Sequence, residues 1–108
     1  SALPRQLVTE ILMCGDRLGA NRLNDLGIVN QIAPSGEALA KALELAERLN
    51  ALAPNILASN KELINRAQHS SLNEQLAEER KQFVRNLHHA NAGIGIDAFL
   101  AKQAPKFV

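Results

Sequence analysis

Aromatic residues are scarce in this sequence, which has three Phe and neither Trp nor Tyr among its 108 residues. Platforms on which nucleic-acid bases could stack are therefore few. An excess of charge of one sign is also missing, because twelve Lys and Arg offset eleven Asp and Glu to give +1 at pH 7. Proteins that bind nucleic acids need a positive excess to neutralise phosphates. Together, these two deficits argue against a nucleic-acid partner.

Cysteine is nearly missing as well, since Cys14 stands alone. A single Cys excludes an internal disulfide and fits a reducing compartment, so we expect a cytoplasmic protein. No apolar run approaches the ~20 residues that a transmembrane helix needs, which argues against a membrane partner. The composition, 46% hydrophobic and 21% charged, is typical of a globular protein. We therefore expect one domain, residues 1–108, with a small apolar core.

Apolar residues recur at helical spacing along the chain, and Gly and Pro separate the segments. The pattern predicts an all-α fold of about six helices, with only a brief extended piece that is too isolated to found a sheet. The expected helices cover residues 4–15, 20–26, 36–52, 55–68, 71–87 and 92–102.

The fifth predicted helix has the clearest start signal. Ser71 and Glu74 have the spacing of a capping box, in which each side chain satisfies the other residue's free backbone N–H. Glu74, Glu78 and Glu79 precede the basic residues of this segment, which is the order that the helix dipole favours. The three carboxylates could also form a cluster for acid–base catalysis. Their position at a helix start explains them more simply.

Two further features could carry chemistry. His88 and His89 would point about 100° apart on a helix, so they do not converge on one metal ion without a loop. We interpret them as a solvated helix end, where an imidazolium meets the carbonyl dipole. Cys14 has no His among its sequence neighbours, so we expect a buried small apolar residue rather than a nucleophile. Residue chemistry alone therefore indicates neither an active site nor a metal site.

Three stretches of the sequence resemble one known family. Residues 14–20 (CGDRLGA) with 26–30 (LGIVN) are similar to its "TG-x-x-x-x-A … G-L-V-N" segment, and residues 57–61 (LASNK) are similar to its "x-A-x-x-K" helix. Residues 96–107 (IDAFLAKQAPKF) resemble its closing "I-x-A-F-L-x-K-x-x-P-x-F". In this order and spacing, the chain resembles the C-terminal part of the enoyl-CoA hydratase/isomerase, or crotonase, family.

The resemblance implies that the catalytic groups lie elsewhere. In that family an upstream spiral domain holds the oxyanion hole, which stabilises an enolate, and usually the acid–base carboxylates. We expect that domain to be absent from these 108 residues, so no residue here is assigned a catalytic role. Coenzyme A would enter only as part of an acyl-CoA thioester substrate, with no separate cofactor.

The resemblance also implies roles in assembly and in binding. The family's C-terminal helices pack subunits into trimers, often paired into hexamers. Its last helix commonly offers an aromatic residue and a lysine to the nucleotide end of coenzyme A in a neighbouring subunit, and Phe99 and Lys102 match these positions. Being three residues apart, they would share one helical face. A simpler interpretation makes Phe99 a core residue and Lys102 a charge at the helix end.

The sequence departs from the family at a few positions. Asn91 replaces a frequent Asp, and we expect it still to cap a helix. Ile94 replaces a frequent Glu, which removes any ion pair made from that position.

We therefore predict the C-terminal helical module of an enoyl-CoA hydratase or isomerase, which serves in subunit assembly and closes the coenzyme A site. Loss of the upstream half would leave apolar helix faces exposed. The alternative is a free-standing helical module for protein interaction, without catalysis.

Overall fold

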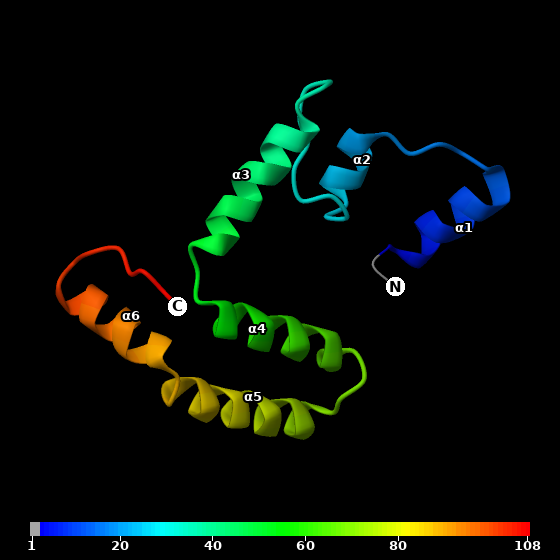
Figure 1. The fold of residues 1–108 in the computed structure, drawn as a ribbon. Helices are drawn as coiled ribbons and strands as arrows, with labels where there is room; N and C mark the ends of the chain where they lie inside the picture. Colours follow the sequence, from blue (N-terminus) through cyan, green and yellow to red (C-terminus); the bar gives the residue numbers. More distant parts are fainter. Residues whose placement is uncertain (1–2) are drawn as a thin grey trace. The chain divides into compact units, whose positions relative to one another are not determined.

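The structure is a computed structural model that describes residues 3–108, and within this range it contains six α-helices and no strand (Figure 1). The all-α prediction is therefore confirmed. The helices are α1 (Arg5–Cys14), α2 (Ala20–Asp25), α3 (Ala38–Asn50), α4 (Pro54–Ala67), α5 (Leu72–Leu87) and α6 (Ala90–Leu100).

Most helix boundaries follow the predicted signals, and the differences have local causes. Helix α3 begins at Ala38 instead of residue 36, because Gly36 has a φ of 84°, which is incompatible with a right-handed helix. Pro54 is the first residue of α4 rather than a separator, since its missing N–H has no helical partner there. Helix α6 begins and ends two residues earlier than expected, at Ala90 and Leu100.

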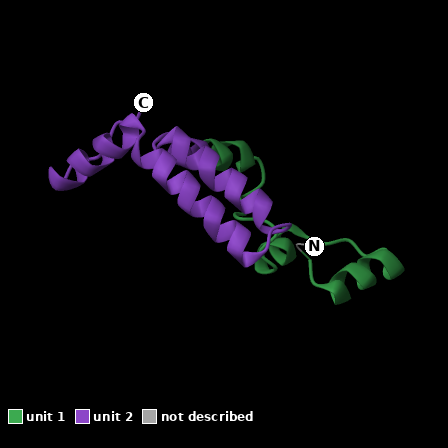
Figure 2. Cartoon of the chain, turned by 90° about the horizontal axis from the view of Figure 1, so that it is seen from below, with its two compact units in different colours: residues 1–43 green, residues 44–108 purple. Residues whose placement is uncertain are grey.

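The chain divides within α3 into two compact units, residues 1–43 and residues 44–108 (Figure 2). In the first unit, α2 ends in a Schellman motif. Gly27 has a φ of 75°, its N–H donates to the Asn24 carbonyl, and the Ile28 N–H donates to the Leu23 carbonyl. Glycine is the usual residue at this left-handed position, because it has no Cβ to clash.

In the second unit, α4 and α5 form a helical hairpin joined by residues 68–71 (Figure 1). The predicted capping box opens α5. The Glu74 N–H donates to Ser71 Oγ at 3.3 Å, and the Ser71 N–H donates to Glu74 Oε2 at 2.8 Å. Two backbone donors at the start of α5 are thereby satisfied.

The Ser71 cap is expected to stabilise the first turn of α5. Ser71→Ala removes one side-chain acceptor and is expected to destabilise α5 by about 1 kcal/mol. Hydrogen exchange should therefore speed up at the first-turn amides of α5. Ser70→Ala, one residue earlier and outside the cap, is the matched control. Equal exchange rates in the two variants would contradict the role of the capping box.

The predicted apolar core is wrong for this chain. Among residues 3–108, Leu7 and Ala53 are the only buried hydrophobic residues, whereas the polar Ser59, Gln82 and Asn91 are buried. Large apolar residues of the second unit are exposed instead, namely Leu45, Leu49, Leu52, Ile56, Ile64, Leu72, Leu76, Phe83, Val84, Leu87, Ile96, Phe99, Leu100 and Val108. Their spacing makes the helices amphipathic as predicted, but the apolar stripes stay largely exposed instead of forming a closed core.

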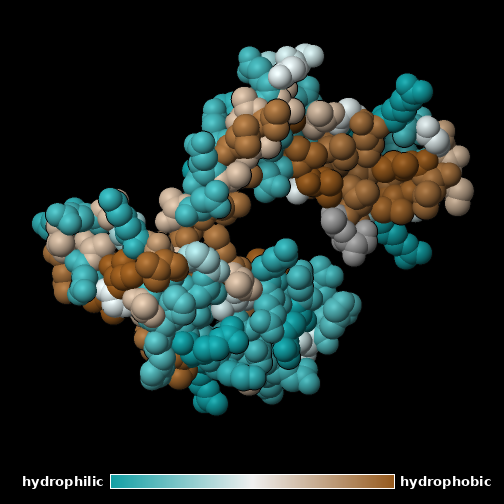
Figure 3. Space-filling model, in the orientation of Figure 1, coloured by the Kyte–Doolittle hydropathy of each residue, from teal (hydrophilic) through white to brown (hydrophobic). Residues whose placement is uncertain are grey.

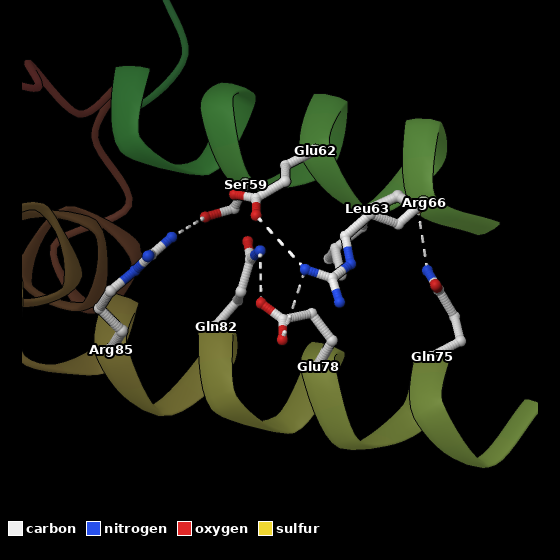
Figure 4. Close-up of polar contacts among 8 residues, drawn as sticks. All are labelled: Ser59, Glu62, Leu63, Arg66, Gln75, Glu78, Gln82 and Arg85. Carbon is white, nitrogen blue, oxygen red and sulfur yellow. Dashed lines mark hydrogen bonds and ion pairs between the residues drawn. The ribbon is translucent and has the colours of Figure 1, made fainter. Parts of the chain in front are cut away.

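Polar side chains join α4 to α5 (Figure 4). Gln75 Nε2 donates to the Leu63 carbonyl at 3.0 Å, which fixes the end of the hairpin near its turn. Further along, Arg66 forms an ion pair with Glu78 at 3.9 Å. Glu78 in turn accepts a hydrogen bond from Gln82, which is 1% exposed. Polar side chains therefore contribute to the contact between α4 and α5, while large apolar residues of both helices remain exposed.

Candidate functional site

Phe99, which the resemblance places in the coenzyme A site, lies in the last turn of α6 and is 81% exposed. It is therefore not a core residue of this chain, contrary to the simpler interpretation. In the space-filling view, hydrophobic and hydrophilic residues are mixed on the surface around α6 and the segment that follows it (Figure 3). An exposed Phe offers a large apolar surface for a flat aromatic ligand or for another protein surface.

Lys102 lies beyond the end of α6, so the argument that it shares a helical face with Phe99 is wrong. Helix α6 ends at Leu100, and Lys102 is an exposed residue in the left-handed region with a φ of 52°. Its N–H donates to the Phe99 carbonyl at 3.1 Å, and the Gln103 N–H donates to the Ala98 carbonyl at 2.9 Å. These two bonds define a Schellman motif, which places Phe99 and Lys102 at one helix end.

The backbone of Lys102 is unusual for its residue type. The same motif ends α2, where glycine occupies the left-handed position at Gly27. A side chain in this conformation costs about 1 kcal/mol, and Lys102 is the only non-glycine residue with positive φ in residues 3–108.

The segment that follows Lys102 returns to the start of α6. A Cβ on Gly95 would lie 3.6 Å from Phe107 Cε1, so Phe107 packs beside the Gly95 backbone. Val108 makes two hydrogen bonds with the Asn91 side chain. Lys106 is an exposed second cation in this segment.

Asn91 does not cap α6, contrary to expectation. The N-cap is His89, whose Nδ1 accepts the Asn91 N–H at 3.0 Å. Asn91 is instead 3% exposed inside the first turn, and its side chain holds Val108 and Asn55. Sequence reasoning missed this role, and the only available signal was the departure from the family's frequent Asp.

The histidines have capping roles at the junction between α5 and α6. His88 is the C-cap of α5, and its Nδ1 lies 2.8 Å from the Val84 carbonyl. His89 caps the next helix, so the two rings serve different helix ends. Within residues 3–108, no three His, Cys, Asp or Glu side chains are grouped closely enough to hold a metal ion. Cys14 is exposed, so its predicted burial is wrong.

The three carboxylates of α5 do not form one cluster. The backbone and side-chain hydrogen bonds of Ser71 lower the pKa of Glu74. The hydrogen bond from Gln82 lowers the pKa of Glu78, and Arg66 acts in the same direction. Both groups therefore stay ionised near neutral pH and serve as acceptors in the helix hairpin rather than as proton donors. Glu79 is exposed on the same helix.

Two apolar hollows lie on the second unit, and sequence reasoning did not find them. The larger, of about 540 Å³, has Ile56, Leu63, Leu76 and Phe83 of α4 and α5 in its lining, together with polar residues that include Ser59 and Gln82. The smaller, of about 330 Å³, is lined by Ile56, Phe83, Leu87, Ile96 and Phe107, among others. Both hollows lie where the amphipathic stripes of α4, α5 and α6 remain exposed.

None of the helices in residues 3–108 is long and apolar enough to span a membrane.

Solved structures of enoyl-CoA hydratases share this fold. One from Polaromonas sp. JS666 superposes with a TM-score of 0.94 at 57% identity, over 99% of this chain and 42% of that protein. Another, from Mycobacterium tuberculosis H37Rv, gives a TM-score of 0.91 at 31% identity, over 99% of this chain and 42% of that protein. The helices described here are thus found within a class of acyl-CoA enzymes.

The family model for enoyl-CoA hydratase/isomerase matches residues 1–108. The chain therefore belongs to the enoyl-CoA hydratase/isomerase family, as its motifs indicated. Curated relatives include 2,3-dehydroadipyl-CoA hydratase of Escherichia coli K12, 29% identical over 95% of this chain and 40% of the relative. Carnitinyl-CoA dehydratase of Proteus mirabilis is 32% identical over 97% of this chain and 42% of the relative. The chain spans about two-fifths of the length of these relatives.

Proposed function

We propose that this chain is the C-terminal part of an enzyme that acts on acyl-CoA thioesters, and that it serves in subunit assembly and in closing the coenzyme A site. Membership of the family supports the substrate class, since the relatives named above are hydratases and a dehydratase of CoA thioesters. The observation that carries the binding role is the strained, exposed Lys102 beside exposed Phe99.

The chemistry of these two side chains suits the nucleotide end of coenzyme A. The Lys102 ammonium is a compact charge that pairs with phosphate, and Phe99 presents a ring on which adenine can stack. Neither group can abstract a proton at the acyl end, so the catalytic groups would belong to the rest of the enzyme. The resemblance to the family implies the same arrangement, in which the catalytic groups belong to an upstream domain and these helices contact coenzyme A.

The exposed apolar stripes support the assembly role. Leu76, Phe83 and Leu87 of α5 and Ile96 of α6 are all exposed and line the two hollows. Apolar patches of this kind are typical of surfaces that other protein surfaces cover. In the proposed enzyme, the upstream part and the neighbouring subunits of a trimer or hexamer cover them.

Lys102→Gly tests the binding role in the native gene product that carries this chain. Glycine adopts the left-handed conformation without strain, so the variant removes the charge and keeps the helix end. We expect the KM for a 2-enoyl-CoA thioester to rise about tenfold, because one charge-assisted contact is lost. The KM for the same acyl group on pantetheine, which lacks the nucleotide, is expected to stay unchanged.

Lys102→Arg is the matched control, since it keeps both the positive charge and a side chain at the same backbone position. It is expected to retain most of the affinity for the CoA thioester. An unchanged KM in Lys102→Gly would contradict the binding role. A native protein with no thioester activity would instead favour the free-standing interaction module.

A further inference from the structure

The Asn91 side chain fixes the end of the chain segment that follows Lys102. Its Oδ1 accepts the Val108 N–H at 2.8 Å, and its Nδ2 donates to the Val108 carbonyl at 2.8 Å. This two-point contact holds a backbone residue as a neighbouring strand would, and it is partly buried, since Asn91 is 3% exposed whereas Val108 is 74% exposed. Residues 103–108 are thereby held at one end by the Schellman motif and at the other end by Asn91.

The contact is anchored to the helix hairpin. Asn91 Nδ2 also donates to Asn55 Oδ1 at 2.8 Å, and Asn55 Nδ2 donates to Asn86 Oδ1 at 3.0 Å. Asn86 in turn donates to Ser59 at 2.9 Å. One continuous hydrogen-bond chain therefore links the end of the segment to α4, α5 and α6. Such networks rigidify the groups that they join when their donors are satisfied.

Strain at Lys102 needs an external restraint. A non-glycine residue keeps a left-handed conformation only where the surrounding structure imposes it. The helix supplies one side of that restraint, because α6 sets the direction in which the chain leaves Ala101. The other side is the fixed end at Val108, together with Phe107 against the Gly95 backbone. Release of that end would allow Lys102 to relax toward the commoner right-handed or extended conformations.

We propose that Asn91 is a positioning residue for coenzyme A binding, which acts by holding residues 103–108 so that Lys102 keeps its left-handed conformation and presents its ammonium to the nucleotide phosphates. This inference rests on the binding role proposed for Lys102. Asn91 itself is buried and touches no substrate.

The test is a double-mutant cycle in the native gene product, with KM and kcat measured for a 2-enoyl-CoA thioester and for its pantetheine analogue. Asn91→Ala is expected to raise the KM for the CoA thioester about threefold to tenfold, with kcat and the KM for pantetheine unchanged. In the Lys102→Gly background, the same substitution is expected to change neither KM, because no charge remains to be positioned.

If Asn91→Ala fails to fold, a second variant, Phe107→Ala, tests the same proposal. Phe107→Ala loosens the same segment without disturbing the buried amides, and it is expected to show the same pattern more weakly. Asn65→Ala, at an exposed asparagine of α4 that lines neither hollow, is the control and should leave both constants unchanged.

The outcomes separate this inference from the binding role on which it rests. If Lys102→Gly raises the KM but Asn91→Ala and Phe107→Ala do not, the positioning role is wrong and the binding role stands. An Asn91→Ala effect that persists in the Lys102→Gly background would also overturn it, because the effect would then be structural. If Lys102→Gly itself has no effect, the binding role fails first.

Discussion

The isolated 108-residue chain is expected to sediment as assemblies heavier than its 11.7 kDa, with a mass that rises with concentration. The reason is the apolar surface of the second unit, where Leu76, Phe83 and Leu87 of α5 are exposed beside Ile96 of α6. Burial of one such side chain contributes about 1.5–3 kcal/mol. A contact between copies that covers several of them would therefore be favourable at micromolar concentration.

Charge substitution on this surface is expected to reverse the association. Leu76→Glu with Phe83→Glu removes two of the largest exposed apolar groups and should weaken self-association by more than tenfold. Asn73→Glu adds one negative charge to α5 without removing apolar surface, so it is the control and should still associate. A chain that sediments as a monomer at all concentrations would show that these stripes do not drive assembly.

Asn91→Asp is expected to destabilise α6 strongly. The Asn91 amide donates two hydrogen bonds, to Asn55 Oδ1 and to the Val108 carbonyl, whereas an ionised carboxylate can donate none. The variant would bury a negative charge against two acceptor oxygens. We expect a loss of about 3 kcal/mol in the free energy of opening of α6, measured by amide hydrogen exchange.

The loss should shrink as the pH falls, because the introduced carboxyl group regains one donor and carries no charge once it is protonated. Asn65→Asp makes the same chemical change at an exposed position of α4 and is expected to shift stability by less than about 0.5 kcal/mol. Equal protection of α6 in Asn91→Asp and in the original protein would contradict the contact between Asn91 and Val108.

The helices could be predicted because their signals are local. The Ser71 cap, Pro54 and the Gly residues each act within a few positions, and the structure confirms six helices near the expected ranges. The end of α6 was predicted less well. Pro105 is a clear stop signal, but the helix ends five residues earlier, in a Schellman motif on Lys102. Because a lysine occupies the position where glycine is usual, the sequence does not indicate that α6 ends there.

The packing could not be predicted, because amphipathic spacing shows which residues share a face and not what that face contacts. The apolar stripe of α5 suggested a core, yet polar contacts join α5 to α4 at Gln75, Glu78 and Asn86. Contacts that join distant positions, such as Asn91 with Val108 and Asn55, leave no periodic signal at all. The candidate site at Phe99 and Lys102 came from the family motif, since neither residue has distinctive chemistry alone.

Native mass spectrometry of the gene product from its source tests the central claim most directly, because one spectrum gives both subunit mass and stoichiometry. The claim is that these residues are the C-terminal, subunit-packing part of an acyl-CoA enzyme. We predict a subunit more than twice as heavy as 11.7 kDa, assembled as three or six copies. A monomeric subunit near 11.7 kDa would contradict the claim and favour a free-standing helical interaction module.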